Sequence, residues 1–217
     1  MRGHIDVLTS KEATDFLLPR HYSGRKPQVS FAFGWIIDGV LSAVITYGKP
    51  ASNTLCDGIC GKDNSQYVYE LNRLCRIDEL TEPLSQFVSA TLRRLSFKNM
   101  IIVSYADSGA NHNGYIYQAT NFLYTGKTKE RLEFYVQGGH SRHGTAESGF
   151  RKIRTAKHRY VYFATKDKRL KKNWLTSLSY KTLPYPKEES LCYELGTFLE
   201  PIIVEYKTNS AIEKELK

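Results

Sequence analysis

The polar residues that follow an apolar run near the middle of the chain are the first place to look for chemistry. Residues 100–103 are Met-Ile-Ile-Val, and the polar cluster from Asp107 to Asn111 follows soon after. A short, unbroken run rich in β-branched residues is typical of a strand buried on both faces. We therefore expect functional side chains at the end of this strand, with Asp107 as the first candidate. The alternative is a carboxylate that caps the turn through Ser108 and Gly109.

Two charged residues lie within a second predicted strand, Tyr67 to Leu74. Side chains alternate along a strand, so Glu70 and Arg73 fall on opposite faces unless a bulge intervenes. Charged groups in a central strand are rarely buried without a partner, and this favours a functional role for both. One allocation makes Arg73 an anion clamp and Glu70 a partner at the edge of the core.

The residues after Gly114 predict a short helix followed by a strand. Residues 115–119 suit the helix, Asn121 suits a left-handed position that ends it, and residues 122–124 form the strand. Together with residues 100–103 these segments make one β-α-β unit.

This unit carries a resemblance to known proteins. The string Y-Q-A-T-N-F, residues 117–122, resembles the Y-x-x-x-G-F signature at the helix-to-strand corner of the GCN5-related N-acetyltransferase (GNAT) fold, with Asn121 in place of the glycine. The chain further resembles the phage Mom DNA-modification family, an offshoot of that fold, through four longer strings: S-Y-A-D (104–107), G-Y-I-Y-Q-A-T-N-F-L-Y-T-G (114–126), R-H-Y-S-G-R-K-P-Q-V-S-F-A-F-G (20–34) and E-L-N-R-L (70–74). These strings occur in the family's order.

The resemblance implies an α+β fold with a GNAT-like mixed, mostly antiparallel central sheet flanked by helices and a basic C-terminal extension. It implies a catalytic core at residues 1–136 and an extension at 137–217 that packs on the core as one continuous domain. In this fold the strands that hold Tyr67–Leu74 and Met100–Tyr105 splay apart, and a CoA thioester lies between them.

The implied activity is conversion of adenine N6 in double-stranded DNA to an N6-methylcarbamoyl (acetamido) derivative, which evades host restriction. The adenine must be flipped out of the duplex, and because its N6 amine is a poor nucleophile the site needs a base and hydrogen-bond donors. Asp107 would bind or deprotonate the amine. Tyr22 would stack on the base, and His21 would act as acid, base or metal ligand. Tyr117 would protonate the leaving group, with Tyr115 as its competitor.

Acetyl-CoA is the cofactor that the fold implies, with Ser85, Arg76 and Tyr117 as its candidate contacts. The stretch from Arg76 to Ser85 departs from the usual Q/R-x-x-G-x-G/A diphosphate loop, because it has no glycine and carries Asp78, Glu79 and Glu82. An acetyl group also lacks the amide nitrogen of the product. A second substrate, or redox chemistry with iron, therefore stays open.

Positive charge is concentrated in one part of the chain. The net charge is +9, and residues 127–187 carry 16 Lys or Arg against 4 Asp or Glu. A basic segment interleaved with aromatic residues suits a nucleic acid, whereas a solvated basic surface is the simpler alternative. The candidate DNA contacts are Arg20, Arg25, Arg142, His143, Arg151, Lys157, Arg159, Lys168, Arg169, Lys171 and Lys172.

The remaining pattern predicts a soluble, cytosolic protein with a full core, because 41% of its 217 residues are hydrophobic and no apolar run approaches membrane-spanning length. The resemblance to a phage family implies that this cytoplasm is the host's. Thr9 and Glu12 predict a capping box, and Asp38-Gly39 predicts a hairpin turn. Residues 48–65 suggest a loop that acts as a lid. A basic helix over 167–178 is expected to face inward with Trp174, Leu175 and Leu178.

Two other functions and one metal site stay open at this point. The chain could be an ordinary acetyltransferase acting on a protein or small molecule, or a non-catalytic DNA-binding protein with a GNAT-like core. Cys56 and Cys60 could join His140 and His143 in a zinc site, although ordinary loop residues explain both pairs as well. The oligomeric state is not indicated by the sequence.

Overall fold

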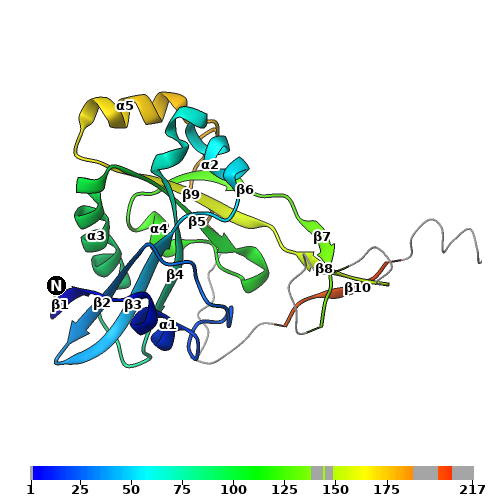
Figure 1. Ribbon diagram of the computed structural model, residues 1–217, viewed down its shortest axis with the longest axis horizontal. Helices are drawn as coiled ribbons and strands as arrows, with labels where there is room; N and C mark the ends of the chain where they lie inside the picture. Colours follow the sequence, from blue (N-terminus) through cyan, green and yellow to red (C-terminus); the bar gives the residue numbers. More distant parts are fainter. Residues whose placement is uncertain (1, 138–143, 145–148, 188–199, 207–217) are drawn as a thin grey trace, which may run out of the picture.

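A seven-stranded mixed sheet forms the centre of the molecule, and a three-stranded sheet projects from one side of it (Figure 1). The computed structural model describes residues 2–137, 144, 149–187 and 200–206. The strand order is β1-β2-β3-β4-β5-β9-β6 in the large sheet and β10-β8-β7 in the small one. The strands are β1 His4–Val7, β2 Phe31–Ile37, β3 Val40–Gly48, β4 Val68–Arg76, β5 Met100–Asp107, β6 Leu123–Lys127, β7 Arg131–Phe134, β8 Phe150–Arg154, β9 Lys157–Ala164 and β10 Ile203–Glu205.

Helices cover both faces of the large sheet. They are α1 Ser10–Leu17, α2 Asn53–Cys60, α3 Leu84–Leu95, α4 Tyr115–Gln118 and α5 Lys168–Ser177, with short 3-10 turns η1 Lys62–Tyr67, η2 Ser96–Lys98 and η3 Ser108–Ala110. Phe87, Val88 and Leu92 of α3 belong to one buried cluster, and Ile59 of α2 and Trp174 of α5 belong to another. The α+β architecture expected from the sequence, a mixed, mostly antiparallel central sheet flanked by helices, is confirmed.

The pairing of β4 with β5 is parallel, unlike the other pairings of the described strands, and it stops early. It runs from Val68 opposite Ile101 to Leu71 opposite Ser104. Beyond that point β4 continues to Arg76 beside β3, and β5 continues to Asp107 beside β9. The expected splay of the two strands is therefore present, and its vertex is the Leu71–Ser104 pair.

Several local signals act as the sequence predicts. The Thr9 side chain accepts the backbone N–H of Glu12 while the Glu12 side chain accepts that of Thr9, which completes the capping box. Asp38 and Gly39 both have positive φ, as a type I′ hairpin turn requires, and Asn121 adopts the expected left-handed conformation with φ of 61°.

The expected lid at residues 48–65 is wrong. This segment contains α2 and the start of η1, and Ser52 caps α2 by accepting the backbone N–H of Leu55. Ile59 and Cys60 are buried against the sheet. The segment forms a short amphipathic helix whose apolar side faces the core, although its glycines and polar residues are more typical of a loop.

The basic helix is present as α5, but its buried face differs from the expected one. Trp174 is fully buried and its Nε1–H donates to Asn64 Oδ1 at 3.0 Å. Leu178 lies partly buried against the same cluster, whereas Leu175 is 47% exposed. Leu175 follows Trp174 directly, and adjacent helical residues point about 100° apart, so one of the two must turn toward solvent.

The strand expected at residues 131–136 is present as β7 Arg131–Phe134, and β8 and β10 were not predicted. Strand β9, which belongs to the expected extension, lies inside the large sheet between β5 and β6. None of the helices within the described ranges is long and apolar enough to cross a membrane.

Gly114 offers a test of how tightly the corner before α4 is packed. A Cβ at Gly114 would meet a Tyr160 ring carbon at 2.3 Å, and the residue has a φ of +83°. Strain and overpacking together should lower the free energy of unfolding of Gly114→Ala by roughly 2–4 kcal/mol. Urea denaturation measures this change.

Gly39 supplies the matched control, because its φ is +79° but nothing lies within 4 Å of the position that a Cβ would occupy. Gly39→Ala should therefore cost only about 1 kcal/mol. Equal costs for the two substitutions would show that Tyr160 yields to the added methyl group.

Candidate active site

A β-bulge on β4 brings Glu70 and Arg73 to the same side of the sheet. Arg73 lies opposite Thr46 on β3, and Leu71 lies opposite Tyr47, so Asn72 is an extra residue on β4. An extra residue reverses the alternation of side chains beyond it. The expectation of opposite faces is therefore corrected, and each of the two charged groups influences the pKa of the other.

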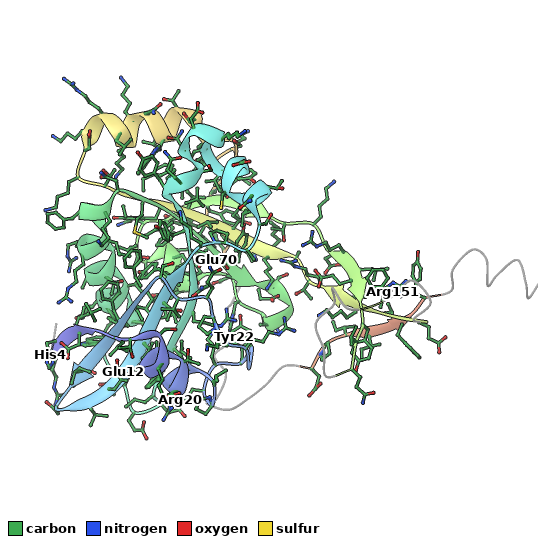
Figure 2. All side chains as sticks on the ribbon, viewed as in Figure 1. His4, Glu12, Arg20, Tyr22, Glu70 and Arg151 are labelled. Carbon is green, nitrogen blue, oxygen red and sulfur yellow. The ribbon has the colours of Figure 1, made fainter. Side chains whose placement is uncertain are left out.

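Glu70, labelled in Figure 2, is a largely buried carboxylate. No other described residue engages it by a hydrogen bond or an ion pair. Burial raises its pKa, although the positive charges of Arg73, Lys157 and Arg154 oppose the shift. A carboxylate with a raised pKa is a better proton acceptor than an ordinary surface glutamate. Glu70 thus has both the environment and the vacant lone pairs that a general base needs.

Arg73 has one donor without a partner. Its Nη1 donates to the carbonyl of Asn72 at 2.5 Å and its Nη2 to the carbonyl of Arg25 at 3.4 Å. Its Nε is buried and has no partner among the described residues. An unsatisfied buried donor costs on the order of 1–3 kcal/mol, and such groups are uncommon in native structures. A hydrogen-bond acceptor on a bound substrate would satisfy this Nε–H of Arg73.

An aromatic group from two loops lies beside these charges. Tyr22 stacks on His21 with ring centroids 4.5 Å apart and meets His112 edge-on at 5.2 Å. Burial, with the nearby charges of Arg73 and His112, lowers the pKa of His21 to about 3. Its Nδ1 accepts the backbone N–H of Ser23 at 3.2 Å, which leaves the ring proton on Nε2.

Tyr117 lies at the vertex of the splay. It lies close enough to Ser104 for that side chain to influence its pKa, and Ser104 Oγ donates to the carbonyl of Leu71 at 2.8 Å. Burial raises the pKa of Tyr117, so its hydroxyl stays protonated near neutral pH. Tyr115 is 70% exposed on the other side of the short helix. The structure therefore places Tyr117, and not its competitor Tyr115, beside β4 and β5.

The carboxylate of Asp107 is already occupied. It accepts the backbone N–H of Gly109 at 3.0 Å and the hydroxyl of Thr155 at 2.5 Å, and it lies 2.7 Å from Lys157 Nζ. Burial alone would raise its pKa, but the bonds from Lys157 and Thr155 outweigh burial and lower it. These contacts match the turn cap that was the alternative interpretation of Asp107.

The loop between β4 and α3 does not fit a diphosphate. Arg76 donates to the carbonyl of Leu80 within its own loop, and Glu82 lies 3.6 Å from Arg2, close to the start of α3. The acidic residues of this turn would repel phosphate oxygens. Ser85 does line an open depression of about 340 Å³, together with Gln86, Ser89, Arg93 and Ala119. The depression could receive a polar chain, but the turn beside it carries the wrong charge for a diphosphate.

The metal hypotheses find no support in the described geometry. Cys56 and Cys60 are buried in the core, and the Cys60 thiol donates to the carbonyl of Trp174 at 3.6 Å. His140 and His143 lie outside the described residues. No group of three or more His, Cys, Asp or Glu side chains that could hold a metal ion, at His21 or elsewhere, occurs within the described ranges.

The candidate DNA contacts separate into three groups. Arg151 is buried with its guanidinium 4.5 Å from the rings of both Phe134 and Tyr206, which makes it part of the small sheet's packing. Three others are partly engaged by protein groups: Arg20 over Phe16, Arg159 over Tyr180 and Lys157 with Asp107. Exposed positions are Arg25, Lys168, Arg169, Lys171 and Lys172, and Arg142 lies, like His143, outside the described residues.

Sequence reasoning missed His112 and Ser104. His112 follows the strand end by five residues and its backbone N–H donates to the Asp107 carbonyl at 3.0 Å. Its position within the polar cluster after β5 was the available signal. Ser104 gave none, because a serine inside an apolar strand does not reveal which face it occupies.

The contacts of Asp107 predict a pH-dependent contribution to stability. Because its pKa is lowered on folding from an ordinary value near 3.8, the stabilisation is fully present above about pH 4 and is lost as the pH falls through the folded pKa. Asp107→Asn should lower the free energy of unfolding at pH 7 by roughly 1.5–3 kcal/mol, the contribution of a hydrogen bond to a charged group. Denaturation at several pH values should show that the deficit shrinks below about pH 4.

Asp15→Asn is the control, because Asp15 forms an exposed ion pair with Lys11 and should cost at most about 1 kcal/mol. A deficit for Asp107→Asn that persists unchanged at pH 3 would contradict a role for the ionised carboxylate.

No curated protein matches the chain. Among solved structures, an N-acetyltransferase from Staphylococcus aureus Mu50 is similar with a TM-score of 0.47 and 11% identity, covering 76% of this chain and 100% of its own. The protein yncA from Salmonella typhimurium, solved with its cofactor acetyl-CoA, is similar with a TM-score of 0.46 and 9% identity, covering 77% and 96%. An acetyltransferase from Bacillus subtilis in complex with CoA has a TM-score of 0.42 and 12% identity, covering 74% and 97%. The model of the Mom protein family matches residues 3–187, and the chain therefore belongs to that family.

Proposed function

We propose that the chain is a phage enzyme that converts adenine N6 in double-stranded DNA to the N6-methylcarbamoyl derivative and acts in the host cytoplasm. Membership of the Mom family over residues 3–187 is the observation that carries this proposal. The site supports it, because a base, an unpaired donor and stacked aromatic rings lie together at the splay of β4 and β5.

Glu70 and Arg73 suit the edge of an adenine. The N6 amine is a hydrogen-bond donor and the neighbouring ring nitrogen N1 is an acceptor, so one base edge can meet both side chains. Glu70 accepts the proton that the weakly nucleophilic amine must lose as its new bond forms. The Nε–H of Arg73 donates to N1 and holds the base in position.

Tyr22 and His21 suit a base that has left the helix. A flipped base must recover its lost stacking in the pocket, and aromatic side chains supply it. His21 is neutral near pH 7 because its pKa lies at about 3. It therefore contributes a hydrogen-bond donor at Nε2 rather than a positive charge.

Tyr117 and Asp107 take different parts in this scheme. The hydroxyl of Tyr117 is protonated and lies at the splay vertex, where it can give a proton to the leaving group of the donor. Asp107 ties the end of β5 to Lys157 and Thr155 of the neighbouring chain segment. Asp107 acts as a positioning residue for the loop that carries His112.

The rival functions make different products. The splay of β4 and β5 is what the resemblance to the GNAT fold implied, so an acetyltransferase acting on protein or a small molecule is the second candidate. It would leave acetyl-lysine or an acetylated metabolite and unmodified DNA. A non-catalytic DNA-binding protein would leave neither product.

The proposal predicts a modified adenine in the DNA of cells that express the chain. Nucleoside mass spectrometry should detect the adduct with the wild-type chain, and Glu70→Gln should reduce it by about 10²–10⁴-fold, the usual contribution of a general base. The wild-type rate should rise with pH through the raised pKa of Glu70, and the variant should lack that rise.

Asp107→Asn is the matched carboxylate control. Assayed at a temperature where it is folded, it should lose much less activity than Glu70→Gln. An inactive but folded Asp107→Asn beside an active Glu70→Gln would exchange the two roles. Unmodified DNA with the wild-type chain would remove the proposed function.

The acidic turn predicts weak use of CoA. Acetyl-CoA should raise the melting temperature only at concentrations well above the micromolar range, in proportion to its occupancy. Glu82→Gln should strengthen this effect, because a negative charge is removed beside the start of α3. Carbon label from acetyl-CoA should then enter the modified adenine, whereas the amide nitrogen has to come from a second substrate, and the two electrons lost when N6 bonds to the acetyl methyl carbon have to pass to an oxidant. Confirmed modification without label would show that another metabolite is the donor.

A further inference from the structure

The small sheet projects from the same end of the large sheet as the candidate site. Asp107, at the end of β5, pairs with Lys157 at the start of β9, and β8 ends only three residues earlier at Arg154. At the other end of this pair of strands, Met100 lies opposite Ala164, and α5 follows. Since β5 spans about 23 Å at roughly 3.3 Å per residue, the small sheet is near the site and α5 is remote from it.

One face of the small sheet is crowded with positive charge. Arg131 lies directly opposite Arg154, and Glu133 directly opposite Lys152, so these four side chains share a face. Glu133 lies 3.0 Å from Arg154, 3.6 Å from Arg131 and 3.9 Å from Lys152. Three cations on this face thus lie near a single carboxylate. The like charges of Arg131 and Arg154, which lie directly opposite each other, destabilise the strand pair.

The positive face continues toward the candidate site through the loop that carries Tyr22. Burial lowers the pKa of Lys152, and the positive charges of Arg25 and Arg154 lower it further against the opposing effect of Glu133. Arg25 is exposed, and its carbonyl accepts the Nη2–H of Arg73. Cations of β8 and of the Tyr22 loop are therefore neighbours beside the site.

The opposite face of the small sheet holds β8 in place. The guanidinium of Arg151, which is labelled in Figure 2, lies 4.5 Å from the ring of Phe134 on β7 and 4.5 Å from that of Tyr206 just after β10. Arg151 is buried by this packing, so alternation along β8 directs Lys152 and Arg154 to the other face. The sheet presents its cations from a fixed strand rather than from a loop.

We infer that Arg25, Lys152 and Arg154 form the surface that contacts the phosphate backbone of the DNA next to the target base. This inference rests on the proposed function. Polyanionic backbone would relieve the repulsion among these cations and release counterions, which is the main source of sequence-independent DNA affinity. The exposed cations of α5, at the far end of β9, then contribute to the general charge and not to the backbone contact at the site.

The salt dependence of DNA binding tests this surface. The affinity of the purified full chain for a fluorescent duplex is measured over a range of salt concentrations. Lys152→Gln/Arg154→Gln should reduce the slope of log affinity against log salt by about 1.8, because each lost phosphate contact removes about 0.9. The charge-keeping variant Lys152→Arg/Arg154→Lys should retain most of the slope.

Two further variants serve as controls: one removes two charges far from the proposed surface, and the other removes the charges of α5. Lys62→Gln/Lys98→Gln removes two exposed charges elsewhere and should leave the slope unchanged. The variant that neutralises Lys168, Arg169, Lys171 and Lys172 tests the expectation that α5 is the DNA surface. A slope that falls with the α5 variant, and not with the β8 variant, overturns the inference.

The result separates the two proposals. If the β8 variant reduces the salt slope but the wild-type chain makes no adenine adduct, the DNA-contacting surface is supported and the proposed function is wrong. If the wild-type chain makes the adduct but the β8 variant leaves the salt slope unchanged, the proposed function is supported and the proposed surface is wrong. If the Gln double variant does not fold, Arg25→Gln alone should reduce the slope by about 0.9.

Discussion

The early end of the hydrogen bonding between β4 and β5 is the constraint on which the site depends. Beyond Leu71 and Ser104, β4 stays hydrogen-bonded to β3 and β5 stays hydrogen-bonded to β9. The two strands therefore remain regular while the edges that face each other separate. Backbone groups on a parted edge need other partners. At the vertex the Ser104 hydroxyl donates to the Leu71 carbonyl, and Tyr117 lies close enough for Ser104 to influence its pKa. The place where pairing fails is thus the place where side chains for chemistry gather.

The bulge at Asn72 adds a second consequence of irregular pairing. Without it, Glu70 and Arg73 would face opposite sides of the sheet, and one of them would be buried against a helix. With it, a carboxylate and a guanidinium lie within electrostatic reach but do not bond to each other. Among the described residues the Glu70 carboxylate and the Nε–H of Arg73 have no partner, and this arrangement suits a molecule that carries both a donor and an acceptor.

The sequence predicted the parts of the fold that depend on local chemistry. The capping box at Thr9, the turn at Asp38-Gly39 and the left-handed Asn121 each follow from the residue types alone. The parts that failed depend on tertiary contacts. A bulge is specified by the register between β3 and β4, and α2 is stabilised by the core beneath Ile59, so neither has a strong local signal. The strand β8 was missed because three of its five residues, FRKIR, are basic, and it lies within a basic segment that is typical of solvated surface.

The contrast between Asp107 and Glu70 shows why residue type and position could not assign the base. Both carboxylates lie near the splayed ends of central strands, and burial pushes both pKa values upward. Around Asp107, bonds from Lys157 and Thr155 reverse that effect, and its lone pairs are used. Around Glu70 the nearby cations only moderate it, and its lone pairs are available. Since a general base needs both a raised pKa, which makes it a better proton acceptor, and room to receive a proton, the partners of each carboxylate decide between them. Those partners come from residues far apart in the chain, and only the folded structure brings them together.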